Sequence, residues 1–437
     1  MYNKLFNKDF YLLWQGQAIS MLGNQVFSIA TIFWIKHVTG SASLIGLIGM
    51  LSTIPAVVLA GFGGAFADRY SRRNIMIYCD LINGIAVLFL SAMLIFIPDE
   101  RNILLAGFII ISILGATVNS FFQPAVSAAI PDIVPSDKIT GANSIGQASL
   151  QLSTFLGQGL GGVLFRLLGA PVLILFNGLS YLFAAFCELF MKIPQSIPEK
   201  SNNWREQSLK IKHDISTGFK YVWQNRGLKN LVLLFSLINF ITVPVIILLP
   251  FYVEDHLKVS IDWYGFLLAA YGVGSLIGYA FAGIIKVDGK SRSAWVLLSI
   301  IFQGVGFAVF GLINSPLIAI LLGALAGMIN GFIGINVVTM LQITTPSDLR
   351  GRVFGFLTSI SGAMAPLGMG LAGIIFDMTG KNIPLIYVSC GTIMFLIAMA
   401  TLFNKDFRTY LSYNSRIKEQ GNITTEDVNI ENETISK

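Results

Sequence analysis

Residues 157–165 read GQGLGGVLF, and residues 368–376, at an offset of 211, read GMGLAGIIF. A second match has the same offset, because the tripeptide Pro-Ser-Asp at residues 135–137 recurs at residues 346–348. Two matches that share one offset make chance similarity between glycine-rich segments a poor explanation. The chain is therefore predicted to consist of two homologous halves.

The composition places these halves in a membrane. Of the 437 residues 54% are hydrophobic and 12% are charged, whereas a soluble domain carries about 25% charged residues. A hydrocarbon core about 30 Å thick needs roughly 20 apolar residues of helix, and many segments of this chain are long enough. The three cysteines lie far apart inside apolar segments, so we expect neither a disulfide framework nor a thiolate metal site.

Twelve segments are predicted to cross the membrane as helices. Residues 74–98 form one of them although Asp80 interrupts it, and Asn314-Ser315-Pro316 divides the longest segment into two. The predicted spans are residues 10–35, 41–67, 74–98, 102–131, 139–165, 167–187, 230–253, 263–285, 353–376 and 382–404, with two more inside 293–347. The fold class is therefore all-α, and helix n of the first six corresponds to helix n+6 in the same orientation.

The distribution of basic residues predicts the orientation. With both termini in the cytoplasm, the cytoplasmic segments hold 24 Lys and Arg residues and the outer loops hold 5. Cytoplasmic loops of membrane proteins carry such an excess, so we expect a multi-pass protein of the cell membrane with both termini inside. The basic residues alternate with apolar segments instead of forming a patch, and no nucleic-acid partner is expected.

Polar segments divide the chain into four parts. Residues 1–192 are predicted to form the first six-helix half and residues 230–404 the second. Residues 193–229 are polar and basic, which predicts a cytoplasmic linker with an amphipathic segment on the membrane surface. Residues 405–437 become polar and then acidic, which predicts a disordered cytoplasmic tail.

The loop between the second and third predicted spans reads GFGGAFADRYSRRN over residues 61–74. It resembles the signature loop of the Major Facilitator Superfamily, G-x-x-x-D-R-x-G-R-R, with Ser71 in the place of a glycine. We expect a gating element in which glycine permits close helix packing and the acid pairs with a basic residue or accepts hydrogen bonds from a helix N-terminus. The alternative is that the charges only set topology. The matching residues are Gly64, Asp68, Arg69, Arg72 and Arg73.

Further motifs resemble the macrolide-efflux and enterobactin-exporter-like branch of the drug:proton antiporters. They lie in residues 10–20, 122–125, 131–135 and 351–354. The resemblance implies the major facilitator fold, alternating access, export and proton antiport, and no enzymatic activity. One departure is Gly115, which stands where many proton-coupled exporters place an arginine.

The glycines of the repeat are expected to pack helices closely together. Those of the fifth span resemble the G-P-x-x-G-G signature of drug exporters, with Gln158 in the place of proline. They also match G-x-G-x-x-G, but a dinucleotide site needs a preceding strand, which mid-membrane helices do not provide. Residues 288–291 lack the first glycine of a phosphate-binding loop, so ATP is not expected to drive transport. The packing glycines are Gly157, Gly159, Gly161, Gly162, Gly368, Gly370 and Gly373.

Two acids inside the spans are candidates for proton coupling. A charge in mid-bilayer costs at least ~2.5–3.5 kcal/mol, so each needs a reason. Glu188 is four residues before Lys192, and an i,i+4 ion pair explains it structurally. Asp80 has no such partner nearby in sequence, which leaves coupling, gating and helix packing as its alternatives.

Uncharged amides fall on the first, fourth, seventh and tenth spans, which line the cavity in the fold that the resemblance implies. Amides among aromatic side chains suit a large, mostly apolar substrate of low charge, although any single amide can serve only to join helices. The candidates are Gln15, Gln17, Asn24, Asn119, Gln123, Asn239, Asn330 and Asn336.

The expected function is export of a hydrophobic or amphipathic small molecule by a monomer in the lipid bilayer, with the proton as coupled ion and no metal or cofactor. Two alternatives remain: a flippase for lipids or lysolipids, and a receptor or scaffold that transports nothing.

Overall fold

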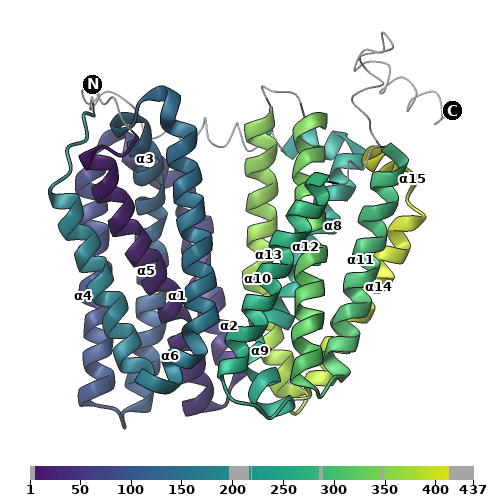
Figure 1. Cartoon of the computed structure of the whole chain (residues 1–437), viewed down its shortest axis with the longest axis horizontal. Helices are drawn as coiled ribbons and strands as arrows, with labels where there is room; N and C mark the ends of the chain where they lie inside the picture. The colour runs from purple at the N-terminus through teal and green to yellow at the C-terminus, as the bar shows by residue number, and fades with distance from the viewer. Residues whose placement is uncertain (1–4, 196–215, 218, 285–288, 346–348, 413–437) are drawn as a thin grey trace.

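The computed structural model describes residues 5–195, 216–217, 219–284, 289–345 and 349–412 (Figure 1). All regular structure in these ranges is helical. The first half contains α1 (Lys8–Thr39), α2 (Ala42–Leu51), α3 (Ile54–Arg69), α4 (Arg72–Phe96), α5 (Arg101–Ile133), the short η1 (Ser136–Lys138) and α6 (Ile139–Leu189). The second half contains α8 (Arg226–Ile247), α9 (Leu249–Phe251), η2 (Tyr252–His256), α10 (Asp262–Ile284), α11 (Gly289–Leu312), α12 (Pro316–Thr344), α13 (Arg350–Met378), α14 (Ile383–Leu402) and the short α15 (Lys405–Leu411).

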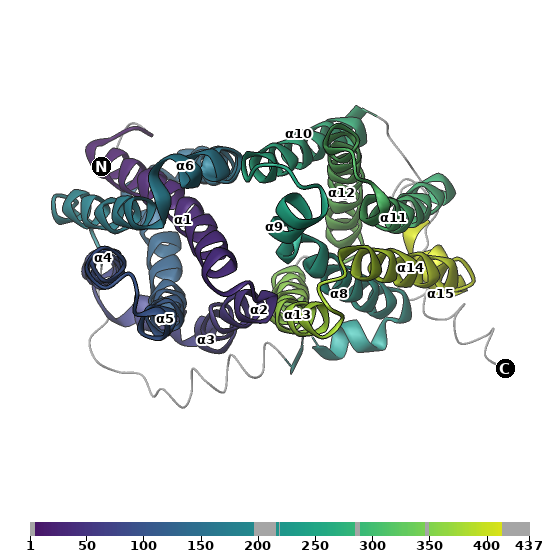
Figure 2. The same ribbon diagram turned by 90° about the horizontal axis from the view of Figure 1, so that it is seen from below.

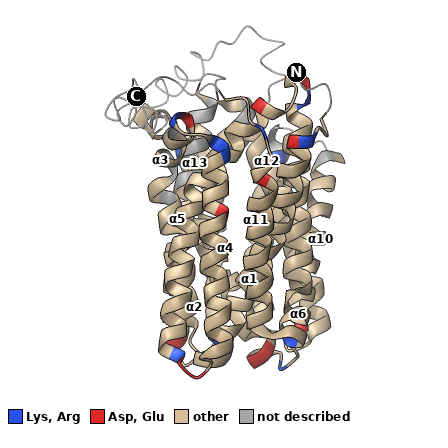
Figure 3. Cartoon of the chain, turned by 90° about the vertical axis from the view of Figure 1, so that its left-hand side faces the viewer, with Lys and Arg blue, Asp and Glu red and all other residues tan. Residues whose placement is uncertain are grey.

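These helices make twelve spans, as predicted. Within the described residues, nine helical segments are at least 18 residues long and apolar enough to cross a membrane. One of the nine, Ser136–Leu189, has 54 residues and bends once, so it contains the fifth and sixth spans. Two shorter apolar helices, Ala42–Ala56 and Gly362–Met378, belong to the second and eleventh spans. Figure 3 shows the charged residues concentrated at the two ends of the helices.

Glycine allows the sharpest bend. Gly169 has φ 73° and ψ 169° inside α6, and Pro171 follows it. A residue with a Cβ rarely adopts this backbone conformation, so glycine here lets the fifth span end and the sixth span return. Gly40, with φ 61°, ends α1 in the same way, and its N–H donates a hydrogen bond to the Lys36 carbonyl oxygen.

The helices form two bundles that follow the two halves of the sequence (Figure 1). Helices α1 to α6 make one bundle, and α8 to α15 make the other. The first and last described residues, 5 and 412, lie at the same end of the molecule, which we call the terminal end; the opposite end is the far end (Figure 1). The loops that follow α1, α4 and α11 lie at the far end, where α2 and α9 are labelled.

The bundles contact one another mainly through two helix pairs, α2 with α13 and α6 with α10 (Figure 2). The contacts are so close that glycine is needed. A Cβ on Gly46 of α2 would collide with the Met369 carbonyl oxygen of α13, and one on Gly265 of α10 would collide with the Gly159 carbonyl oxygen of α6. The first pair joins the second span to the eleventh, and the second pair joins the fifth span to the eighth. The repeat relates span 2 to span 8 and span 5 to span 11, so the two pairs are equivalent.

The repeated glycines lie against equivalent neighbours inside each bundle. A Cβ on Gly157 would meet Gln25 of α1, and one on Gly368 would meet Phe240 and Val243 of α8. The fifth span therefore packs on the first, and the eleventh packs on the seventh. Toward the far end, Gly162 approaches Ile261 before α10, and in the other half Gly373 approaches the Ala42 carbonyl oxygen at the start of α2.

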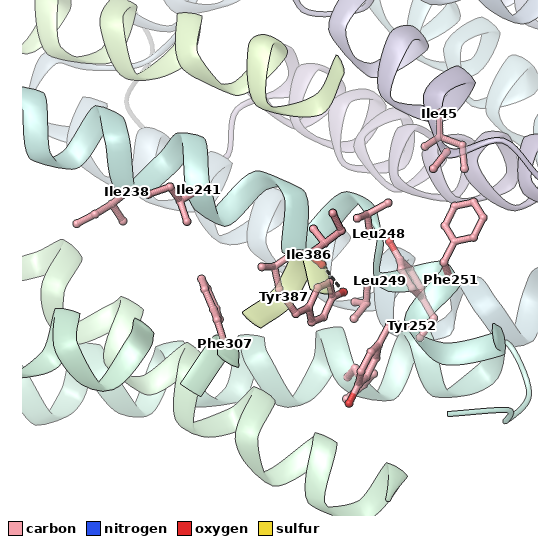
Figure 4. Packing of buried hydrophobic residues seen from close by; sticks show 14 of the residues in the cluster. Ile45, Ile238, Ile241, Leu248, Leu249, Phe251, Tyr252, Phe307, Ile386 and Tyr387 are labelled. Carbon is pink, nitrogen blue, oxygen red and sulfur yellow. Dashed lines mark hydrogen bonds between the residues drawn. The ribbon is translucent and has the colours of Figure 1, made fainter. Parts of the chain in front are cut away.

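One buried hydrophobic cluster runs through both bundles. Figure 4 shows Ile45 of α2 beside Phe251 of α9, close to a group of aromatic rings. In this group Tyr252 stacks on Tyr387, with 5.4 Å between ring centroids, and the Tyr387 hydroxyl donates a 2.8 Å hydrogen bond to the Val245 carbonyl oxygen. The aromatic group fixes the break between α8 and α9.

The disordered tail was predicted to begin at residue 405, but the helical structure continues beyond that position. Residues 405–411 form α15, which begins after the N-cap residue Asn404. The side chains of Phe407 and Leu411 are completely buried, because an amphipathic turn can pack on α8 and α11 as soon as α14 ends. Residues 413–437 and most of the predicted linker lie outside the described residues. The seventh span begins at Arg226, four residues before the predicted position 230.

The glycine contact between the bundles can be tested by substitution. We expect Gly265→Ala to lower the thermal unfolding midpoint of the purified protein, since an added methyl group at a closed backbone contact costs about 1–3 kcal/mol. Gly306→Ala in α11 is the matched control, because no atom lies within 4 Å of a Cβ built there. The control should leave the midpoint unchanged or raise it, as alanine favours helix. Equal midpoints for the two variants would contradict the packing.

Candidate functional site

A polar cavity lies inside the first bundle. Its volume is about 40 Å³, which is room for roughly three water molecules. It is lined by side chains of α1, α4, α5 and α6. The lining residues are Gln17, Ser20, Met21, Asn24, Asp80, Asn83, Asn119, Phe122, Gln123 and Tyr181. Four of the predicted cavity amides and one of the predicted acids thus come together in one place.

Asp80 is the only charged residue among these ten lining residues. Its side chain is 2% exposed, and no group of the described chain donates a hydrogen bond to its Oδ2 atom. The absence of a basic residue from the lining agrees with the sequence, where Gly115 on the neighbouring helix α5 provides no side chain. A buried carboxylate without a partner is costly and is more often functional than structural.

Four of the five amides in the lining are also without protein partners. Among the described residues, the side chains of Gln17, Asn83, Asn119 and Gln123 make no hydrogen bond to another protein group, and the Gln17 Nε2 atom is fully buried. Asn24 is different, because its Oδ1 atom accepts a 2.6 Å hydrogen bond from the Tyr181 hydroxyl. Most of these amides therefore remain available to a ligand and do not serve to join helices.

Met21, Asn83 and Tyr181 are members of the lining that the sequence patterns do not single out. Asn83 and Tyr181 lie on the third and sixth spans, and only the first, fourth, seventh and tenth spans were expected to contribute. The spacing gives one usable signal: Asn83 follows Asp80 by three residues, so both side chains share a helix face.

The predicted pairing of Glu188 with Lys192 is wrong. Glu188 is 2% exposed, its Oε2 atom has no hydrogen-bond partner in the described chain, and Lys192 is exposed beyond the end of α6. The helix ends at Leu189, so residue 192 no longer lies one turn above residue 188. Glu188 instead lies near Asp80, and the two carboxylates interact electrostatically.

The remaining predicted amides lie away from this cavity. Gln15 donates a 3.4 Å hydrogen bond to the Cys187 Sγ atom, and Asn239 and Asn336 donate to carbonyl oxygens one turn back in their own helices. Asn330 is half-buried in α12. In the described structure the polar lining of the cavity thus belongs to the first half alone.

The predicted gating loop connects α3 to α4, and its main ion pair differs from the predicted one. Arg72 donates a 2.5 Å hydrogen bond to Asp132 of α5 and a 2.9 Å hydrogen bond to the Ala128 carbonyl oxygen. Asp68 lies 3.8 Å from Arg72 and is 63% exposed, so this pair is weak. Asp132 belongs to a different segment of the sequence, and the loop motif does not reveal it.

Two more residues of the loop have defined positions. Arg73 donates hydrogen bonds to the backbone carbonyl oxygens of Glu188 and Leu189, so it ties the loop to the end of α6. The close helix approach occurs at Gly63, where a Cβ would collide with the Ser120 carbonyl oxygen, and not at Gly64, which has open space around it. Arg69 is half-buried at the end of α3.

A charge cluster at the far end joins the two bundles, and the sequence patterns do not predict it. Lys36 of α1 is 6% exposed and donates hydrogen bonds to Glu254, at 2.5 Å, and to Asp255, at 3.2 Å. The Pro250 carbonyl oxygen accepts a third, at 3.1 Å. His37 contacts Glu254 at 3.1 Å. We call Lys36, His37, Glu254 and Asp255 the far-end latch.

Two further polar contacts between the bundles flank this latch. Asp377 at the end of α13 caps α2 by accepting hydrogen bonds from Ser41 and Ser43, the shortest at 2.6 Å. Arg166 in the bent helix α6 pairs with Asp262 of α10 at 3.2 Å. Arg166 and Asp377 are 211 residues apart, so the repeat places a cross-bundle contact at both equivalent positions although the charges are opposite. The cross-bundle contacts of Lys36, Asp377 and Arg166 all lie toward the far end.

Comparison with known proteins agrees with this architecture. A family model described as Major Facilitator Superfamily matches residues 13–369 and 245–420. Macrolide efflux protein A of Streptococcus pyogenes is 24% identical over 394 residues, which cover 89% of this chain and 94% of that protein. Multidrug efflux pump Tap of Mycolicibacterium fortuitum is 27% identical over 391 residues, covering 87% and 92%.

A solved structure has the same fold. A bacterial homolog of the human lysosomal transporter Spinster, in an inward-facing and unoccupied conformation, superposes with a TM-score of 0.69. The alignment covers 94% of this chain and 98% of that one at 14% sequence identity.

The far-end latch predicts how the bundles respond to loss of a charge. Removing one partner of a buried ion pair costs about 3–5 kcal/mol, and less here because Asp255 still contacts Lys36. We therefore expect Glu254→Gln to favour separation of the bundles at the far end. Spin labels are placed at the exposed positions Pro98 and Asn314, one in each half. Double electron–electron resonance should then show a component at a longer distance than in the unsubstituted protein.

Asp99→Asn is the control for this measurement, since Asp99 is an exposed acid at the same end and forms no ion pair in the described structure. It should leave the distance distribution as in the unsubstituted protein. An unchanged distribution for Glu254→Gln would remove the latch from the set of gating contacts.

Proposed function

The chain belongs to the Major Facilitator Superfamily of transporters, and from this premise we propose that it exports hydrophobic or amphipathic small molecules from the cell. The observation that carries the proposal is similarity to two efflux pumps over nearly the whole chain. The chemistry of the cavity lining also suits contact with part of such a molecule, because the lining combines amides and aromatic rings with a single charge. We further propose that the protein works as a monomer.

The arrangement of contacts supports alternating access. In the orientation that the basic residues predict, the terminal end is cytoplasmic and the far end is external. The far-end latch and its two flanking contacts then hold the external side shut. On the cytoplasmic side, the loop between α3 and α4 is held by contacts within its own bundle, through Arg72 and Asp132. Transport requires these two sets of contacts to break and form in alternation.

Asp80 is the residue that we propose for proton coupling. A carboxylate with no basic partner can bind a proton inside the protein and release it where water reaches it. One charge that crosses a potential of 100 mV gains about 2.3 kcal/mol, enough to bias two conformations of similar energy. Glu188 lies close by and is the second candidate.

Drug accumulation separates export from its alternatives. Cells that overproduce the protein should accumulate less radiolabelled macrolide or ethidium than cells that carry the Asp80→Asn variant, and an uncoupler should abolish the difference. The same cells should translocate a fluorescent lysolipid at the background rate. Lysolipid translocation without any effect on drug accumulation would identify a flippase instead.

The loop between α3 and α4 predicts different effects for its two acids. Asp68→Asn should impair transport and leave the thermal unfolding midpoint nearly unchanged, since its exposed ion pair contributes under about 1 kcal/mol. Asp132→Asn should lower the midpoint as well, because a hydrogen bond to a charged group contributes about 1.5–3 kcal/mol. Transport in inverted vesicles and a thermal melt of each variant provide the comparison. Normal export by Asp68→Asn would exclude a gating role for this acid.

Coupling of export to the proton gradient through Asp80 predicts a specific transport defect for Asp80→Asn. The variant should lose uphill, pH-dependent export and retain downhill exchange of substrate, because the asparagine cannot carry a proton but leaves the cavity in place. Vesicles with and without an imposed proton gradient measure the two activities, with Asp99→Asn as the control. Uphill export with unchanged pH dependence would make Asp80 structural and leave Glu188 or Asp68 as the proton carrier.

A further inference from the structure

The charges of the far-end latch do not balance while its histidine is neutral. The latch has two carboxylates, Glu254 and Asp255, and both of them contact one lysine, Lys36. The Pro250 carbonyl oxygen accepts a third hydrogen bond from the same ammonium group, so all three of its hydrogens are used. With His37 neutral, two negative charges therefore face a single positive charge.

His37 is placed to supply the missing positive charge. Its Nε2 atom lies 3.1 Å from both carboxylate oxygens of Glu254. A neutral imidazole can donate to this carboxylate only when its proton is on Nε2, whereas a protonated imidazole donates and also carries a full positive charge. Protonation of His37 thus adds a second ion pair between the bundles and balances the charges of the latch.

The surroundings of His37 make Glu254 its direct ionic partner. The His37 ring also lies 6.1 Å from the ring of Phe33 and 5.7 Å from that of Phe165. The charged residues on the neighbouring elements are Lys36, Arg166, Glu254, Asp255, Lys258, Asp262 and Lys381. Of these, Arg166 and Asp262 pair with one another at 3.2 Å, and the Lys381 Nζ atom lies beside Gly40 at the end of α1.

The imidazole can exchange protons with the medium at the far end. The His37 side chain is 46% exposed, whereas Asp80 and Glu188 are each 2% exposed. Histidine ordinarily changes its charge between about pH 5 and 8, a range in which a carboxylate paired with a lysine stays ionised. In the orientation that the basic residues predict, the charge of the latch therefore follows the external pH.

We propose that His37 makes the far-end latch a sensor of external pH, which holds the external side shut more firmly as the medium becomes acidic. Protonation adds an ion pair that exists only while the bundles are closed at the far end, so the closed state binds this proton more tightly than the open state. The added stability is present at acidic pH and is lost as the pH rises.

This inference rests on alternating access in the proposed function and adds a form of regulation to it. His37 takes up and releases its proton on one side of the membrane, so the device carries no proton across. It therefore differs from proton coupling through Asp80.

Distances across the far end test the proposal in the purified protein. Spin labels at Pro98 and Asn314 are measured by double electron–electron resonance at about pH 8 and about pH 5.5, on either side of the ordinary histidine titration. We expect the ratio of closed to open molecules to rise about two- to fivefold on acidification, the effect of one partly exposed ion pair.

Two substitutions at residue 37 fix the charge of the latch. His37→Gln keeps an N–H donor for Glu254 but cannot be protonated, so the ratio should stay near its alkaline value at both pH values. His37→Lys stays positively charged and should keep the ratio near its acidic value. His256→Gln is the matched control, because the His256 ring at the same end contacts the Ile313 carbonyl oxygen and stacks on Tyr252. This control should retain the full response.

The buried acids Asp80 and Glu188 are intact in all three variants, so a pH response that arises from them would persist in His37→Gln. The proposal is overturned if His37→Gln responds to pH as fully as the unsubstituted protein, or if the unsubstituted protein does not respond. Either result leaves the proposed function intact, provided that Glu254→Gln opens the far end and export depends on the proton gradient. Failure of those two measurements would instead contradict the proposed function itself.

Discussion

The bilayer provides no hydrogen-bond partner for a buried charge, and this constraint determines where the charged groups of the chain lie. Nearly all of them are at the two ends of the helices, where water or an opposite charge is available. The far-end latch shows the rule, since the buried Lys36 contacts two carboxylates and a carbonyl oxygen. Asp80 and Glu188 do not follow it, because each has a carboxylate oxygen without a partner. This is the observation on which we base the proposal that Asp80 or Glu188 has a task beyond stability.

Glycine determines where the two bundles touch. The repeat that relates the two halves places a glycine of α2 against the backbone of α13 and a glycine of α10 against the backbone of α6. Without a hydrophobic driving force between helices in lipid, close backbone packing is a main source of attraction. Such contacts depend on distance and little on side-chain direction. Two contacts of this kind, related by the repeat, can serve as hinges about which the bundles rotate.

The sequence predicted the parts of the fold that depend on local pattern. Twelve spans, the parallel repeat and four amides of the cavity follow from hydropathy, an offset and residue type. The pairing of Arg72 with Asp132, the far-end latch and the cavity roles of Asn83 and Tyr181 did not follow, because they join residues far apart in the chain. The error at Glu188 has a local cause, since α6 ends before the residue that was expected to pair with it.

Helix α1 connects the cavity to the far-end latch. Gln17 and Asn24 line the cavity, and Lys36 lies 12 residues beyond Asn24 on the same helix, which corresponds to a rise of about 18 Å. Coupling between two sites needs an element with two arrangements that both sites bias. A tilt of α1 would change the distance of its amides from Asp80 and the distance of Lys36 from Glu254 in a single motion. A change at Asp80 that draws these amides inward would therefore alter the stability of the latch, and such a tilt of α1 would link the cavity to opening of the far end.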